Sequence, residues 1–118
     1  MQFKRSERVS ELLRHEISLL IQEIKDSRLG FVTVTAVRLS DDLTDAKVFY
    51  SVFGSEEEKK ISSEILDFSI PKMRKTLGRK LESLRKVPVI SFVYDQTPEK
   101  AERVTAILTQ LAKEKEEN

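Results

Sequence analysis

The sequence predicts an α+β fold in which helices cover a small mixed β-sheet. Two observations favour this class. Segments with helical spacing of apolar residues alternate with short β-branched runs, and their order is helix, strand, strand, helix, break, helix, strand, helix. The 118 residues contain no internal repeat and no long linker, so we expect one domain over residues 1–118, with residues 113–118 as a frayed tail.

The first half of the chain predicts a helix followed by a β-hairpin. Apolar residues recur at helical spacing from Ser6 to Ile24, which indicates an amphipathic helix. Residues 31–39, FVTVTAVRL, are rich in β-branched and aromatic side chains and predict a strand. The segment 40–45, SDDLTD, favours a tight turn that joins this strand to a second one at 46–53.

A second helix is expected after the hairpin, and a break should end it. Ser55 and Glu58 have the spacing of a capping box and open a helix that runs to about Ser69. Pro71 has no amide hydrogen and its ring clashes with the preceding helical turn. We therefore expect Ser69, Ile70 and Pro71 to form a break between this helix and a third one.

The last third of the chain predicts a strand and a final helix. Pro88 sets the end of the third helix, and the apolar run VISFVY at 89–94 predicts a strand. Thr97 followed by Pro98 is typical of a helix start. The apolar residues of this last helix are expected to face inward: Ala101, Val104, Leu108 and Leu111.

Composition limits the classes of function. The formal net charge is +1, so a nucleic-acid role must come from the distribution of charge rather than from an overall basic chain. The chain has no cysteine, one histidine and three isolated glycines, so the usual thiolate, zinc-protease and phosphate-loop patterns are missing. No apolar run reaches the roughly 18 residues of a membrane span. We expect a soluble cytoplasmic protein that is not an enzyme and needs no cofactor or metal.

One stretch concentrates positive charge. Residues 70–88 contain seven lysines and arginines against a single acid, Glu82. On a straight helix, four of these cations fall within an arc of about 60° opposite the apolar face: Lys72, Lys75, Arg79 and Lys86. Such a ridge could follow a phosphate backbone, with Gly78 permitting close approach of a ligand or a neighbouring backbone. The pattern is also typical of a solvated helix face, and both interpretations stay open at this point.

Three aromatic residues of the second strand could stack on unpaired bases: Phe49, Tyr50 and Phe53. Alternation along a strand places Phe49 and Phe53 on one face of the sheet and Tyr50 on the other. At least one of the two sets therefore belongs to the core, and the core interpretation is favoured.

Several segments together resemble the ribosome-binding factor A family of bacteria. They are Arg8 and Val9, the hairpin VTVTAVRLSDDLTDAKVFYSVFG, the triplet LGR at 77–79, and Val87-Pro88 running into FVYD at 92–95. The resemblance spans about residues 3–112. It implies a single KH-like domain of type II topology, α-β-β-α-kink-α-β, with an additional C-terminal helix. It also implies binding to the free small (30S) ribosomal subunit and 16S rRNA, help in maturation and in processing of the rRNA 5′ end, and a role in growth in the cold.

The sequence departs from related proteins in two places. Conventional KH modules clamp RNA with a GxxG loop, and this sequence contains no such tetrapeptide. The family usually has an Ala-x-Gly kink between its central helices, where this chain has Ser69-Ile70-Pro71. The RNA contacts and the angle of the break must therefore be built differently here.

Charge and resemblance together predict an RNA-binding surface. Its residues are Lys72, Arg74, Lys75, Gly78, Arg79, Lys80, Arg85 and Lys86, extended by Lys4, Arg5 and Arg8. We expect a monomer that binds the small subunit and 16S rRNA, with ribosomal proteins and other assembly factors as further candidate partners. Two alternatives stay open. One is a protein-interaction module that uses a sheet edge or a helix face, and the other is an RNA-processing enzyme, for which no acid, base or metal site is evident.

Overall fold

The computed structural model describes residues 5–82 and 84–117. Its elements, in chain order, are α1 (Arg5–Gln22), β1 (Phe31–Leu39), β2 (Asp45–Phe53), α2 (Glu56–Lys80), β3 (Val89–Tyr94) and α3 (Thr97–Glu117). The strands form one sheet in the order β1-β2-β3. The α+β class and the KH-like fold predicted from the sequence are confirmed.

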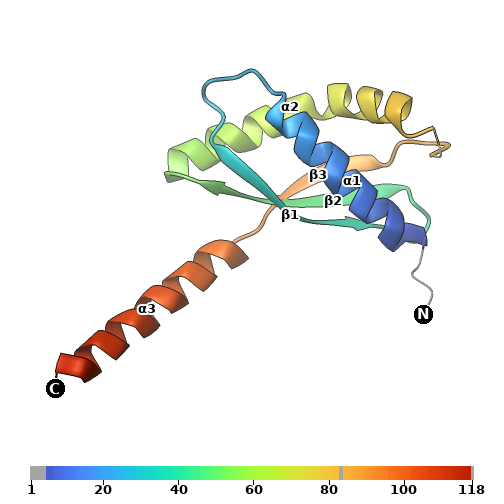
Figure 1. Cartoon of the computed structure of the whole chain (residues 1–118). Helices are drawn as coiled ribbons and strands as arrows, with labels where there is room; N and C mark the ends of the chain where they lie inside the picture. Colours follow the sequence, from blue (N-terminus) through green and yellow to red (C-terminus); the bar gives the residue numbers. More distant parts are fainter. Residues whose placement is uncertain (1–4, 83, 118) are drawn as a thin grey trace.

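The sheet is mixed, as expected. β1 pairs with β2 in antiparallel register, Val32 opposite Val52, and a bulge interrupts this register between Val34 and Ala36. β3 lies parallel to β2, with Ile90 beside Ala46. The parallel pairing requires a crossover, and α2 provides it (Figure 1).

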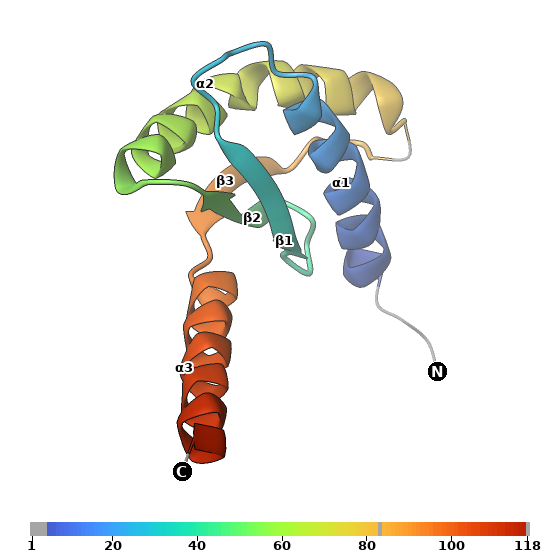
Figure 2. The same cartoon turned by 60° about the vertical axis from the view of Figure 1, so that its left-hand side comes forward.

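The core lies between one face of the sheet and the helices α1 and α2, which cover the same face (Figures 1 and 2). Alternate residues of β2, among them Val48 and Tyr50, point into this core. α1 contributes Leu13 and Ile17, and α2 contributes Leu77 among others; all are buried. The helical spacing of apolar residues in the sequence therefore identified most of the packed face of α1 and that of the second half of α2, where Met73 and Leu77 are buried. In the first half of α2 the spacing of Ile61, Ile65 and Phe68 was a poor guide, because Phe68 is 89% exposed and the buried positions are Ser62 and Leu66.

The predicted break at Ser69, Ile70 and Pro71 is corrected in one respect: α2 continues through Pro71 as a single helix. Figure 2 shows that its two halves run in different directions, so the proline lies inside a bent helix rather than between two helices. Pro71 removes one helical hydrogen bond, and the Ser69 hydroxyl donates to the Leu66 carbonyl at 2.7 Å. Both features are known causes of bending.

The predicted third helix is shorter than expected, because α2 ends at Lys80 and Leu81 caps it. Leu84 and Pro88 are buried beyond this end. To bury them, the chain must leave the helix axis and turn back toward β3. Arg85 and Lys86 therefore lie on a loop, and the prediction that Lys86 shares a helical ridge with Lys72, Lys75 and Arg79 is wrong.

The last helix differs most from its prediction. α3 extends away from the body of the protein, which accounts for overall dimensions of 64 × 43 × 17 Å (Figure 1). Its apolar residues, predicted to face inward, are exposed instead: Ala101, Val104, Leu108 and Leu111. The helix continues through Glu117, so residues 113–117 are helical rather than frayed, and Asn118 lies outside the described residues. Within the described part of the chain, no helix has the length and apolar character needed to span a membrane.

Candidate nucleic-acid interface

A large hollow of about 1040 Å³ gathers cations from separate parts of the chain. It lies where the start of α1, the β1–β2 turn, the second half of α2 and the loop before β3 meet. Among the described residues that line it, five are cations and one is an acid: Arg5, Arg74, Lys75, Arg85, Lys86 and Asp42. We call this the basic hollow. It brings together five of the residues that the sequence predicts for RNA binding.

Arg74 fixes the wall of the basic hollow. Its guanidinium donates from Nε to the Pro88 carbonyl at 3.1 Å and from Nη2 to the Val87 carbonyl at 3.0 Å. These bonds join α2 to the loop before β3 across half-buried positions. Arg74 therefore holds in place the loop that carries Arg85 and Lys86, a structural role that its sequence neighbourhood did not reveal.

Gly78 allows the same loop to pack closely against α2. A Cβ at this position would lie 3.2 Å from Cγ2 of Val87, which is a tight contact. The glycine thus lets the loop after Lys80 pass close to α2, so the close approach predicted at Gly78 is made by a side chain of the protein itself.

The turn between β1 and β2 forms the opposite rim of the hollow. Asp42 accepts hydrogen bonds from the hydroxyls of Ser40 and Thr44 at 2.7 and 2.8 Å, and these bonds hold the pKa of its carboxyl below the ordinary value. The carboxylate therefore stays charged and opposes anion binding at this rim. Leu43 has a positive φ of 64°, which tightens the turn that brings Asp42 and Thr44 to the hollow.

The other predicted cations lie outside the basic hollow. Lys72 lines a small separate hollow of about 130 Å³ that also includes Glu23, and Arg79 is exposed on α2. Lys80 is 3.7 Å from Glu16 of α1, so it is partly neutralised. Arg8 lines a different hollow between α1 and β1, and Lys4 lies outside the described residues.

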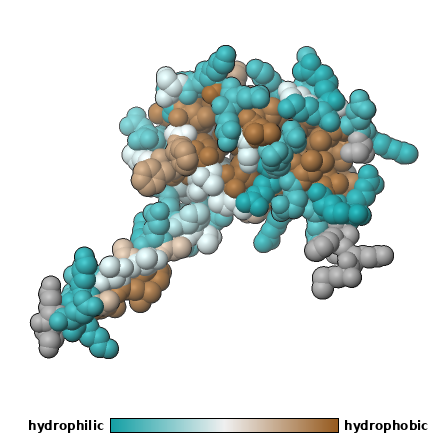
Figure 3. Space-filling model, viewed as in Figure 1, coloured by the Kyte–Doolittle hydropathy of each residue, from teal (hydrophilic) through white to brown (hydrophobic). Residues whose placement is uncertain are grey.

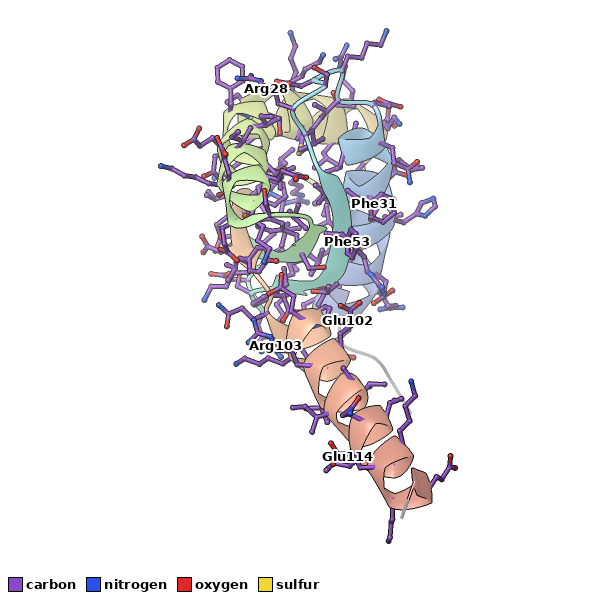
Figure 4. The ribbon with its side chains drawn as sticks, turned by 90° about the vertical axis from the view of Figure 1, so that its left-hand side faces the viewer. Arg28, Phe31, Phe53, Glu102, Arg103 and Glu114 are labelled. Carbon is purple, nitrogen blue, oxygen red and sulfur yellow. The ribbon has the colours of Figure 1, made fainter. Side chains whose placement is uncertain are left out.

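The aromatic residues divide as alternation predicts. Tyr50 is buried in the core, whereas Phe49 lies on the opposite face beneath the Arg38 guanidinium, 5.7 Å from its ring centroid. Phe53 is 77% exposed and pairs across the strands with Phe31, which is 75% exposed (Figure 4). The sequence did not single out Phe31. It is the first residue of β1, and alternation along a strand does not show whether a residue at its end is buried or exposed.

No group of three or more histidine, aspartate or glutamate side chains in the described residues is placed to hold a metal ion. The chemistry that the arrangement offers is the binding of anions. Four of its cations, Arg5, Lys75, Arg85 and Lys86, are exposed around a concave surface, and arginine can contact phosphate through two hydrogen bonds at once.

Comparison with known proteins gives a consistent result. The profile of the family described as ribosome-binding factor A matches residues 5–108. The chain is 40% identical to ribosome-binding factor A of Geotalea daltonii over 92% of this chain and 89% of that protein. It is 39% identical to the protein of the same name from Halothermothrix orenii, over 98% of this chain and 95% of the relative.

Solved structures with the same name share the fold. The crystal structure of ribosome-binding factor A from Thermus thermophilus is 27% identical, with a TM-score of 0.66 over 75% of this chain and 94% of that one. The solution structure of a putative ribosome-binding factor A from Thermotoga maritima is 31% identical, with a TM-score of 0.67 over 75% and 85% of the two chains. A homology model of the Thermus thermophilus protein, fitted into a cryo-EM map of its complex with the 30S subunit, is 28% identical, with a TM-score of 0.62 over 74% of this chain and 91% of that one.

Proposed function

The chain belongs to the ribosome-binding factor A family, and we propose that it is an assembly factor that binds the free small ribosomal subunit through 16S rRNA. The fitted complex of the Thermus thermophilus relative with the 30S subunit supports this partner. The single observation that carries the proposal in this chain is the basic hollow, which collects positive charge in a protein with a formal net charge of only +1.

The basic hollow replaces the GxxG clamp of conventional KH modules. Lys75, Arg85 and Lys86 would contact successive phosphates of an unpaired strand, with Arg5 at the far rim. Arg74 would act mainly by holding the loop, because two of its donor nitrogens already bind backbone carbonyls. The remaining predicted cations on α2, Lys72 and Arg79, would add attraction over a longer distance.

The test is co-sedimentation with purified small subunits and with assembled ribosomes. We expect the wild-type protein to bind the free small subunit, and Lys75→Glu/Arg85→Glu/Lys86→Glu to lose at least about tenfold in affinity, since each reversal removes a phosphate contact and adds repulsion. The matched control, Lys25→Glu/Lys47→Glu/Lys60→Glu, changes the same number of exposed charges outside the hollow and should bind nearly as wild type does.

Either of two results would contradict this placement. Equal losses in the two triple variants would show that only the total charge matters. Full binding by the Lys75→Glu/Arg85→Glu/Lys86→Glu variant, once its fold is verified by circular dichroism, would move the interface away from the basic hollow while leaving the family membership intact.

We also propose the finer roles that the family resemblance implies: late subunit maturation in the cytoplasm, assistance to rRNA 5′ end processing, and support of growth in the cold. The protein would act by binding rather than by catalysis. Purified protein should then leave precursor 16S rRNA uncut, and its addition should change 5′ end processing only when ribosomal particles and cellular nucleases are present. Turnover of naked precursor by the protein alone would overturn the non-enzymatic part.

A further inference from the structure

α3 carries an exposed apolar stripe. Its four large residues are Val104, Ile107, Leu108 and Leu111, and each is 55–61% exposed. We call them the α3 stripe. Figure 3 shows hydrophobic side chains gathered along one side of this projecting helix. An exposed apolar face of this length is typical of a surface that binds another molecule.

The spacing of the stripe is that of helix-to-helix pairing. Three residues of the stripe, with Ala101 before them, follow one another at intervals of three, four and three residues, which is the a/d pattern of a coiled coil: Ala101, Val104, Leu108 and Leu111. Ile107 lies beside this seam. In proteins, amphipathic helices gain most of their stability from the packing of their apolar face rather than from helix propensity. Docking another helix against the α3 stripe would supply that packing.

We do not expect the sheet of the same molecule to cover the α3 stripe. Contacts of its first turn hold α3 in its projecting direction. Glu99 pairs with Lys59 of α2 at 2.7 Å and accepts a hydrogen bond from the Tyr94 hydroxyl. Asp95 accepts from Thr35 at 2.7 Å and from the Thr97 backbone amide at 2.9 Å. We call these four contacts the α3 anchor. Folding α3 back over the sheet would break the two contacts of Glu99.

The charges beside the stripe favour a second copy in antiparallel orientation. On a helical wheel, Lys100, Arg103 and Glu114 lie on the same flank as Ile107, within an arc of about 60°. Figure 4 shows Arg103 and Glu114 on the same side of α3. The cations stand near the start of the helix and the acid near its end, so an antiparallel partner places opposite charges together twice. In a parallel pair the same flanks of the two helices lie on opposite sides of the seam, so these charges would not pair with one another.

We propose that the α3 stripe is a self-association surface on which the α3 helix of a second copy of this chain docks antiparallel, with Lys100 and Arg103 of each copy beside Glu114 of the other. The 21 residues of α3 span about 30 Å, so the two bodies sit at opposite ends of the pair. The contact is small, and the dimer is therefore weak and populated only at high protein concentration.

Sedimentation equilibrium over a concentration series tests the association. The wild-type protein should pass from monomer to dimer as concentration rises, and Leu108→Glu should weaken the dimer by at least about tenfold, because it places a charge in the centre of the seam. Thr109→Glu adds the same charge on the opposite side of α3 and should leave the dimer intact. A protein that stays monomeric at every concentration overturns the proposal, as does equal weakening by both variants.

Charge reversal and cross-linking test the orientation. Lys100→Glu and Glu114→Lys should each weaken the dimer, and the variant carrying both changes should restore it. The natural chain has no cysteine, so Lys100→Cys and Glu114→Cys proteins can be mixed and oxidised without interference. Preferential disulfide formation between the two different variants is expected. Preferential joining of identical variants would overturn the antiparallel arrangement. These results do not depend on the basic hollow, so they leave the proposed ribosomal function to its own test.

Discussion

At the scale of single residues, the adjacent cations Arg74 and Lys75 have different roles: one stabilises the fold and the other is placed to bind RNA. Arg74 binds the carbonyls of Val87 and Pro88, while Lys75 is exposed at the basic hollow. Replacing Arg74 by methionine should therefore lower the free energy of unfolding by about 2 kcal/mol, since half-buried carbonyls lose charged donors. Lys75→Met should leave stability nearly unchanged and still weaken RNA binding. Urea unfolding and RNA titration of both variants separate the two roles. Equal stabilities would contradict the clamp assigned to Arg74.

The sequence could not separate these two cations. Both occur in the same basic run, and nothing in their spacing tells a phosphate ligand from a clamp on the protein's own backbone. The same holds for Gly78, whose open side is filled by Val87. The sequence shows which residues carry positive charge, but not which groups they contact. Those contacts depend on the course of the loop after Lys80, which turns back so that Leu84 and Pro88 are buried.

At the scale of elements, three features act on the bend of α2: the ring of Pro71, the hydrogen bond from the Ser69 hydroxyl to the Leu66 carbonyl, and the packing of the two halves. Buried residues lie on both sides of the proline, among them Leu66 and Leu77. Because these side chains fix both halves against the core, we expect Pro71→Ala to keep the bend. The variant should gain up to about 1 kcal/mol in stability through the restored helical amide. Thermal unfolding and amide chemical shifts check this. A loss of stability would show that the proline itself is required.

The α3 anchor should depend on pH. Lys59 and the Tyr94 hydroxyl lower the pKa of Glu99, and the Thr35 hydroxyl lowers that of Asp95. Their ionised forms favour the anchored state, so their contribution is complete above the ordinary carboxyl pKa of about 4 and is lost as pH falls through the lowered folded-state values. Small-angle scattering at low concentration should show α3 sampling more directions in acid. Glu99→Gln should already show part of this effect at neutral pH.

The elements themselves were largely predictable. The hairpin followed from β-branched runs around SDDLTD, and the cap at Ser55 followed from its spacing to Glu58, whose backbone amide donates to the Ser55 hydroxyl at 3.2 Å. The direction of α3 was not predictable, because an amphipathic pattern shows that a face requires burial but does not identify what buries it. Side-chain contacts such as Lys59–Glu99 join residues far apart in the chain, and the periodicity of the sequence does not predict such contacts.

At the scale of the whole molecule, the distribution of charge decides how binding responds to salt. Each phosphate neutralised on a single strand contributes about −0.7 to the slope of log K against log salt. If the four exposed cations of the basic hollow make the contacts, the slope should be about −3; if all seven cations of residues 70–88 do so, it should be about −5. Titration of a short unpaired RNA from 16S rRNA over a salt series distinguishes the two.

The same titration can be sharpened with two matched variants. Lys75→Gln/Lys86→Gln removes two cations of the hollow and should reduce the slope by about 1.4, whereas Lys72→Gln/Arg79→Gln removes two cations outside it and should change the slope little. The comparison works because each pair lowers the net charge by the same amount, so only the position of the charges differs. Equal slopes for the two variants would mean that RNA follows the whole of the second half of α2, and that the hollow is one part of a longer contact.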